Sequence, residues 1–278
     1  MKILVTGCGG QLGRAVAEEL QSRGHTVVRT DRKNMDITDR EAVERMLLSE
    51  EPDAIVHCAA YTNVEHAEEE PSLCRMANVQ GTAHIAKYCK RQGRKLLYIS
   101  TDYVFGGEGD GPHGEDDKAS PINVYGQSKY DGEQIVRTLD RYFIVRTSWV
   151  FGKGGNNFVT AILRRARQGQ ALQVVDDQIG SPTYTDDLAA LLADMAESEE
   201  YGVYHATNEG ECTWYELARE TVRLAGIDAE ITPISAAAYG GKAKRPSDSR
   251  LAKHALDRAG FRRLPDWKDA LKRYIQYL

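Results

Sequence analysis

The feature that most constrains this chain is a group of glycines directly after its first apolar segment. Residues 2–6 (KILVT) are followed by Gly7, Gly10 and Gly13, and residues 14–23 carry a helical pattern. Glycine permits a tight turn in which backbone N–H groups approach a pyrophosphate, and the start of a helix adds a partial positive charge. The pattern predicts a dinucleotide-binding turn that opens a βαβ unit. A plain strand–helix turn is the alternative.

Further along the chain, short apolar runs continue to alternate with helical patterns. The strands are expected at residues 26–29, 54–58, 96–100 and 142–149, and the helices at 40–49, 71–92 and 124–139. Such alternation predicts right-handed crossovers and a parallel sheet covered by helices on both faces. The expected fold class is therefore α/β, a Rossmann-type doubly wound sheet with a smaller mixed C-terminal lobe.

The division of the chain into lobes follows from where this regularity ends. We expect residues 1–150 to form the dinucleotide-binding domain, and the chain to return to it in about 184–225. Residues 151–278 would mainly form the substrate-binding lobe, where helices are expected at 157–168, 186–197 and 214–225 and near Leu251 and Trp267.

Composition excludes several classes of protein. The net charge of -5 over 278 residues does not suggest a nucleic-acid partner. No apolar run approaches the roughly 20 residues that span a bilayer, and the first residues lack the apolar core of a signal peptide. Five cysteines without a C-x-x-C pair favour reduced thiols over disulfides or zinc. We expect a cytoplasmic protein without a membrane or nucleic-acid partner.

The end of the second expected strand bears on the choice of cofactor. Asp31 lies 18 residues beyond Gly13, where an acidic side chain can bond the ribose hydroxyls of NAD. Arg32 and Lys33 could instead pair with the additional phosphate of NADP. These signals conflict, and surface charge unrelated to a cofactor is the alternative. The expectation is NADPH, with NADH also accepted.

A catalytic set is expected at the carboxyl end of the sheet. Tyr125 and Lys129 share one face of a helix, and an ammonium near a phenol should lower its pKa. Lys129 can also hold the nicotinamide ribose. Thr101 ends the fourth strand, where its hydroxyl could orient a carbonyl group while Tyr125 donates a proton to its oxygen. By itself, a Tyr-x-x-x-Lys spacing is more often a solvated helix face.

Five segments now support a resemblance that covers nearly the whole chain. They are STDYVFG at 100–106, YGQSK at 125–129, RTSWVFG at 146–152, QIGSPT at 178–183 and RPSDS at 245–249. The chain resembles the extended short-chain dehydrogenase/reductases, and within them it is most similar to the dTDP-4-dehydrorhamnose reductases. The last three segments are the ones more specific to sugar-nucleotide reductases.

The resemblance implies roles for individual residues. The catalytic triad would be Thr101, Tyr125 and Lys129. The cofactor would be bound by Gly7, Gly10, Gln11, Leu12, Gly13, Asp31, Arg32, Asp36, Ile37, Cys58, Ala59, Ala60, Tyr61, Asn78, Tyr125 and Lys129. The substrate would be bound by Thr62, Val64, Thr101, Asp102, Tyr103, Tyr125, Trp149, Asn157 and Arg245, the last pairing with its diphosphate. For Asn78, Trp149 and Arg245, a packing or surface role is the alternative. Some relatives dimerise through magnesium held by glutamates, but no spacing here singles out a metal site. We expect none and leave a homodimer open.

The implied activity is NAD(P)H-dependent reduction of the C4 ketone of dTDP-4-dehydro-L-rhamnose, in surface polysaccharide synthesis. Two alternatives remain. One is reduction of another nucleotide-linked 4-keto sugar. The other is a non-catalytic, cofactor-binding regulatory subunit, like the beta subunit of eukaryotic methionine adenosyltransferase. A 4,6-dehydratase is disfavoured, because it would normally show an acidic pair after the strand-end threonine, and here Tyr103 follows Asp102.

Overall fold

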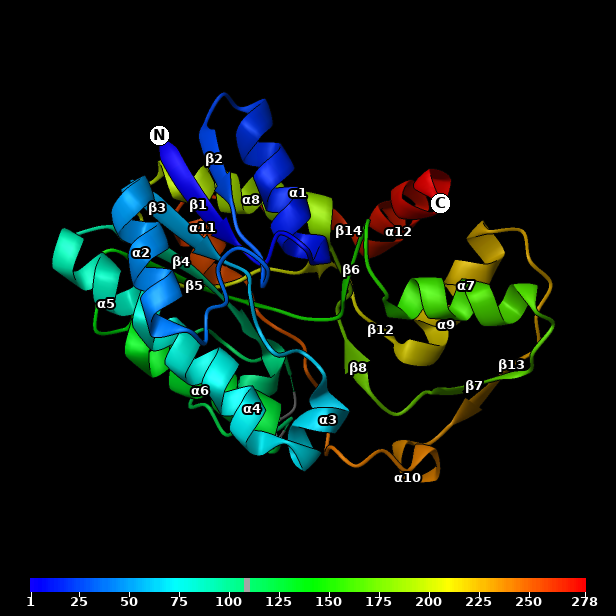
Figure 1. Cartoon of the computed structure of the whole chain (residues 1–278). Helices are drawn as coiled ribbons and strands as arrows, with labels where there is room; N and C mark the ends of the chain where they lie inside the picture. Colours follow the sequence, from blue (N-terminus) through cyan, green and yellow to red (C-terminus); the bar gives the residue numbers. More distant parts are fainter. Residues whose placement is uncertain (108–110) are drawn as a thin grey trace.

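A six-stranded parallel sheet lies at the centre of the computed structural model, which describes residues 1–107 and 111–278 (Figure 1). Its order is β10-β5-β4-β3-β1-β2. The strands are β1 (Lys2–Thr6), β2 (Thr26–Arg29), β3 (Ala54–His57), β4 (Lys95–Thr101), β5 (Tyr142–Thr147) and β10 (Gly202–His205). All five pairings are parallel, and the order turns between β1 and β3. This confirms the expected doubly wound α/β class.

Helices cover both faces of this sheet. One face packs against α1 (Gln11–Ser22), α8 (Thr185–Glu197) and α11 (His254–Arg258). The other packs against α2 (Arg40–Glu50), α5 (Thr82–Gln92) and α6 (Val124–Val136). The strands are apolar on both sides because each face is buried, as in β3, where every residue is buried.

The helix expected over 71–92 forms, with an irregular middle. It consists of α4 (Pro71–Arg75), the π-helical segment η1 (Met76–Gly81) and α5. Asn78 lies in the π segment, and its side chain bonds the backbone of Tyr61. A short helix before it, α3 (Val64–Glu69), was not predicted.

The remaining elements build a smaller lobe beside the carboxyl ends of the sheet (Figure 1). Its helices are α7 (Phe158–Arg167), α9 (Trp214–Leu224), α10 (Ala236–Tyr239) and α12 (Trp267–Tyr277), and a short helix η2 (Asp102–Val104) follows β4. Its paired strands are β6 (Val150–Phe151) with β9 (Thr183–Tyr184), β7 (Leu172–Val175) with β13 (Ile231–Ile234), β8 (Ile179–Gly180) with β12 (Cys212–Thr213), and β11 (Asn208–Glu209) with β14 (Leu264–Asp266).

The chain crosses between the lobes more than once. After β9 it returns to the sheet through α8 and β10, whereas α9 packs in the core of the smaller lobe. The division at residue 150 stays a prediction.

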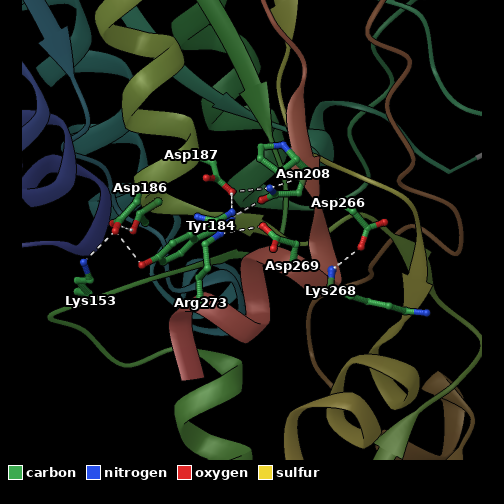
Figure 2. Close-up of polar contacts among 11 residues, drawn as sticks. Lys153, Tyr184, Asp186, Asp187, Asn208, Asp266, Lys268, Asp269 and Arg273 are labelled. Carbon is green, nitrogen blue, oxygen red and sulfur yellow. Dashed lines mark hydrogen bonds and ion pairs between the residues drawn. The ribbon is translucent and has the colours of Figure 1, made fainter. Parts of the chain in front are cut away.

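A polar junction joins α8 to α12 where the lobes meet (Figure 2). Asp187 accepts hydrogen bonds from Arg273 at 2.8 Å and from Asn208 at 2.7 Å. Asp186 accepts from Tyr184 at 2.8 Å and from Lys153 at 2.9 Å. The start of α8 is thereby tied to α12 and to the segment that follows β6, which fixes the smaller lobe over the sheet.

In the part of the chain that the structure describes, no helix is both long and apolar enough to span a membrane.

Candidate active site

One cavity of about 960 Å³ lies between the carboxyl ends of β1, β3, β4 and β5 and the smaller lobe. Most of the predicted site residues line it. They are Gly7, Gly10, Gln11, Leu12, Gly13, Asp31, Arg32, Asp36, Ile37, Cys58, Ala59, Ala60, Tyr61, Thr62, Val64, Thr101, Asp102, Tyr103, Tyr125, Lys129 and Trp149. Three predicted residues, Asn78, Asn157 and Arg245, do not line it.

Two positions of the glycine turn have no room for a Cβ atom. Gly7 has a φ of +72°, and a Cβ atom there would lie 2.8 Å from the amide nitrogen of Ala59. A Cβ atom on Gly13 would lie 2.3 Å from the carbonyl oxygen of Gly7. The twelve-residue helix α1 begins at Gln11, and no side chain caps its N-terminus. Its first N–H groups are therefore available to an anion, and the residues present fit the pyrophosphate of a dinucleotide.

The opposite charges after β2, Asp31 and Arg32, both line the cavity. The Asp31 carboxylate faces Gly9, where a Cβ atom would be 4.0 Å from Oδ2. The Arg32 side chain is 90% exposed, and its Nε lies 3.4 Å from Oδ2 of Asp36. Asp31 is therefore held close to the glycine turn, while the exposed Arg32 side chain pairs with Asp36 and also lines the cavity.

Removing either charge should change the cofactor preference. Arg32→Ala should lower kcat/KM for NADPH about tenfold, the value of one charged hydrogen bond, and should change that for NADH less than about twofold. Asp31→Ala should lower kcat/KM mainly for NADH. Steady-state kinetics with both cofactors checks this, and equal losses with both in either variant would contradict it.

Asn78 is buried and does not line the cavity, but it contacts residues that do. It is 1% exposed, accepts from the amide of Tyr61 at 2.7 Å and donates to the Tyr61 carbonyl at 3.0 Å. It also donates to Ser128 Oγ on α6 at 2.9 Å. Asn78 therefore ties the segment after β3 to the helix that carries the catalytic pair, in agreement with the packing alternative.

The three expected catalytic residues meet on one wall of the cavity. Thr101 ends β4, and Tyr125 and Lys129 lie in the first turns of α6, whose N-terminus is capped by Asn123. A Cβ atom on Gly126 would lie 2.1 Å from the carbonyl oxygen of Tyr103, so α6 packs directly on the segment that follows Thr101. That contact brings the helix pair and the strand-end hydroxyl together.

One electrostatic expectation at this wall was wrong. Lys129 was expected to lower the pKa of the Tyr125 phenol. Instead, burial raises that pKa, the Asp102 carboxylate raises it further, and a hydrogen bond with Thr101 opposes both. Burial also lowers the pKa of Lys129 to about 7. Tyr125 is thus a neutral phenol before substrate binds, the form a proton donor requires.

Asp102 presents an unsatisfied carboxyl group at this wall. It is 2% exposed; its Oδ1 accepts from the Thr101 hydroxyl at 2.9 Å, whereas its Oδ2 is buried without a hydrogen-bond partner. Burial raises its pKa to about 7, against the hydrogen bond from Thr101.

Asp102→Asn should therefore stabilise the protein more at high pH than at low pH. The pKa of Asp102 is higher in the folded state, so protonation contributes stability below about pH 4, and this is lost as the pH rises to about 7. Relative to wild type, the free energy of unfolding of the variant should rise by up to about 4 kcal/mol between pH 4 and pH 8. Urea unfolding without ligand measures this. A variant whose difference from wild type is the same at both pH values would contradict the assignment.

The substrate side of the cavity contains a pair of stacked indoles. The rings of Trp149 and Trp214 are 3.6 Å apart at 12°, and both residues line the cavity. Trp149 has a φ of +49°, an uncommon conformation outside glycine, and its ring covers Gly180. Trp214 was not predicted, because it begins an ordinary amphipathic helix and nothing in the sequence pairs it with Trp149.

The other two predicted residues have partners of their own. Arg245 forms an ion pair with Glu65 at 2.5 Å. Asn157 caps α7, and its amide donates to Gln11 at 2.8 Å and to the Tyr274 hydroxyl at 3.0 Å. Both link the smaller lobe to the region around the cavity, and their contacts with a substrate stay predictions.

Within residues 1–107 and 111–278, no three His, Cys, Asp or Glu side chains gather as metal ligands.

The cavity lies at the end of a parallel sheet and combines the glycine turn with the Thr101, Tyr125 and Lys129 side chains. Together these features define an NAD(P)-dependent oxidoreductase of the extended short-chain dehydrogenase/reductase class.

Comparison with known proteins places the chain within this class. The family model described as RmlD substrate binding domain matches residues 1–278. The chain is 41% identical to the spore coat polysaccharide biosynthesis protein SpsK of Bacillus subtilis (99% of this chain, 97% of the relative). It is 42% identical to a dTDP-4-dehydrorhamnose reductase of Streptomyces griseus, in an alignment that covers 96% of this chain and 91% of the relative. It resembles the crystal structure of dTDP-4-dehydrorhamnose reductase from Bacillus anthracis in complex with NADP, with a TM-score of 0.97 and 39% identity. The superposition covers 100% of this chain and 99% of that one. The chain belongs to the RmlD substrate-binding domain family.

Proposed function

We propose that this chain reduces the C4 ketone of dTDP-4-dehydro-L-rhamnose to give dTDP-L-rhamnose, with NADPH as the cofactor. The observation that carries the proposal is that Thr101, Tyr125 and Lys129 line the same cavity as the glycine turn. The family and the names of its similar members support the sugar and the nucleotide. The resemblance to a spore coat polysaccharide protein supports a role in surface polysaccharide synthesis.

Each residue of the set has one task. When NADPH is bound, it supplies a hydride to the carbonyl carbon. The Thr101 hydroxyl orients the carbonyl oxygen. Tyr125, a neutral phenol, donates its proton to the oxygen as negative charge develops there. The ammonium of Lys129 then stabilises the phenolate that remains.

The rest of the cavity holds the substrate. We infer that the Trp149 ring, backed by Trp214, packs against the deoxysugar or its nucleotide, and that Thr62 and Val64 border the sugar. Asp102 Oδ2, which has no partner in the structure, is available to a sugar hydroxyl. Arg245 would exchange its ion pair with Glu65 for the diphosphate. A cytoplasmic location and a homodimer stay predictions.

A direct assay separates the remaining alternatives. The keto sugar is generated from dTDP-glucose by its upstream enzymes, and the loss of NADPH absorbance is followed. Turnover with the dTDP-linked sugar, and much less with the UDP-linked one, is expected. Faster turnover with another nucleotide-linked keto sugar would favour the first alternative. Tight NADPH binding without turnover of any keto sugar would favour the regulatory subunit.

A further inference from the structure

The ammonium of Lys129 lies in an unusual setting. The side chain is 3% exposed, and Nζ lies 4.0 Å from the centroid of the Tyr98 ring. In the part of the chain that the structure describes, no acidic side chain lies within ion-pair distance of it. Glu133, whose charge acts on Lys129, itself accepts hydrogen bonds from Nε and Nη2 of Arg146, at 2.9 and 2.8 Å. The close partner of this buried cation is an aromatic face.

Tyr98 is held so that it cannot turn away. It lies on β4, three residues before Thr101, and is fully buried. Its hydroxyl donates to the carbonyl oxygen of Lys129 at 3.2 Å. The same hydroxyl fills the space over Gly132, where a Cβ atom would lie 2.2 Å from it. The ring is thereby fixed to the helix at the residue whose side chain it supports.

We propose that Tyr98 is a positioning residue for the reduction, whose ring holds the Lys129 side chain in place and in its charged form. This rests on the proposed function, in which the ammonium of Lys129 stabilises the Tyr125 phenolate. A buried cation is stabilised by the negative face of an aromatic ring, most strongly where water is excluded. Gly132 leaves the space that the Tyr98 side chain occupies, because a larger residue there would displace the ring.

Apart from Glu133, which is paired with Arg146, the titratable groups around Lys129 supply no counter-charge. Burial lowers the pKa of Lys129 to about 7, so its charge depends on what faces it. Burial lowers the pKa of His57 to about 3 and raises the pKa of the thiols of Cys58 and Cys74. All three are therefore neutral near pH 7. The titratable groups that act on Lys129 or contact it are His57 and Cys58 at the end of β3, Cys74 on α4, Tyr98 on β4 and Glu133 on α6.

The test compares two substitutions that differ in the ring. Tyr98→Phe keeps the ring and loses the hydroxyl, so kcat should stay within about threefold of wild type with an unchanged pH profile. Tyr98→Leu removes the ring and should lower kcat at least about tenfold. Without the ring the charged form is less favoured, so the pKa of Lys129 falls further. The alkaline limb of kcat should then move to lower pH by roughly one unit.

A second readout does not depend on turnover. Because Lys129 is also expected to hold the nicotinamide ribose, NADPH affinity measured by fluorescence should weaken above a limiting pH. That limit should fall by the same amount in Tyr98→Leu and not in Tyr98→Phe. If wild type turns over no keto sugar, the proposed function fails, and this readout still decides the role of Tyr98.

Thermal melting serves as the control that each variant is folded. Where Tyr98→Leu does not fold, Tyr98→Met fills similar space without an aromatic face and takes its place. A folded Leu or Met variant with the wild-type pH limits would overturn the proposal. A Tyr98→Phe variant as impaired as Tyr98→Leu would also overturn it, because the hydroxyl would then be the part that matters.

Discussion

Tyr125→Phe is expected to lower kcat by about three orders of magnitude while the dissociation constant of NADPH changes less than about threefold. General acid catalysis contributes about 10²- to 10⁴-fold, and the Tyr125 phenol, the proposed proton donor, lines the cavity. Phenylalanine retains the ring that meets Tyr103 edge-on at 6.2 Å, so the wall keeps its shape. Single-turnover kinetics and fluorescence titration with NADPH separate the two effects.

The matched control is a second tyrosine on the same helix. Tyr130 does not line the cavity and packs instead near Val104, Phe105 and Leu251. Tyr130→Phe removes a hydroxyl from α6 as well, and kcat should stay within about twofold of wild type. A Tyr125→Phe variant within tenfold of wild type would show that the proton comes from another group.

The largest effect on stability is expected from Glu133→Gln. Glu133 and Arg146 are 0% and 2% exposed and form two parallel hydrogen bonds, and Ser100 donates to the same carboxylate at 2.6 Å. Removing one charge leaves the other buried without compensation, which costs about 3–5 kcal/mol. Because this pair ties α6 to β4 and β5, kcat should fall too. Urea unfolding at constant pH measures the change in free energy of unfolding.

A half-buried carboxylate on the same helix provides the comparison. Asp131 pairs with Arg75 at 2.8 Å near the surface, and Asp131→Asn should cost less than about 1 kcal/mol. The double variant Glu133→Leu with Arg146→Met should regain much of the stability lost in Glu133→Gln, because neither charge then remains buried. If Glu133→Gln were no more destabilising than Asp131→Asn, the buried pair would not anchor the catalytic helix.

The parts of the fold that follow local patterns could be predicted from the sequence. Both faces of the sheet are covered, so its first five strands appear as short apolar runs. The glycine turn requires glycine at Gly7 and Gly13, where a Cβ atom would meet backbone. Tyr125 and Lys129 are four residues apart on one helix, and Thr101 ends a strand, so the parallel topology brings all three to one wall.

What the sequence could not reveal depends on contacts between distant segments. Trp214 stacks on Trp149 although the two are 65 residues apart in the sequence. Arg245 pairs with Glu65, which is 180 residues away in the sequence. Neither pairing leaves a local signal. The pKa of Tyr125 was predicted in the wrong direction for the same reason. Lys129 meets the Tyr98 ring, and the effect of burial on the phenol follows from packing of α6 against β4.

The central claim is that the cavity transfers a hydride from NADPH to C4 of a nucleotide-linked keto sugar. We would incubate the wild-type protein with dTDP-4-dehydro-L-rhamnose and NADPH deuterated at the reactive position of the nicotinamide, and examine the product by NMR. The account predicts dTDP-L-rhamnose with one deuterium at C4 of the sugar. A product without deuterium at C4, or NADPH that binds and is not consumed, would contradict it.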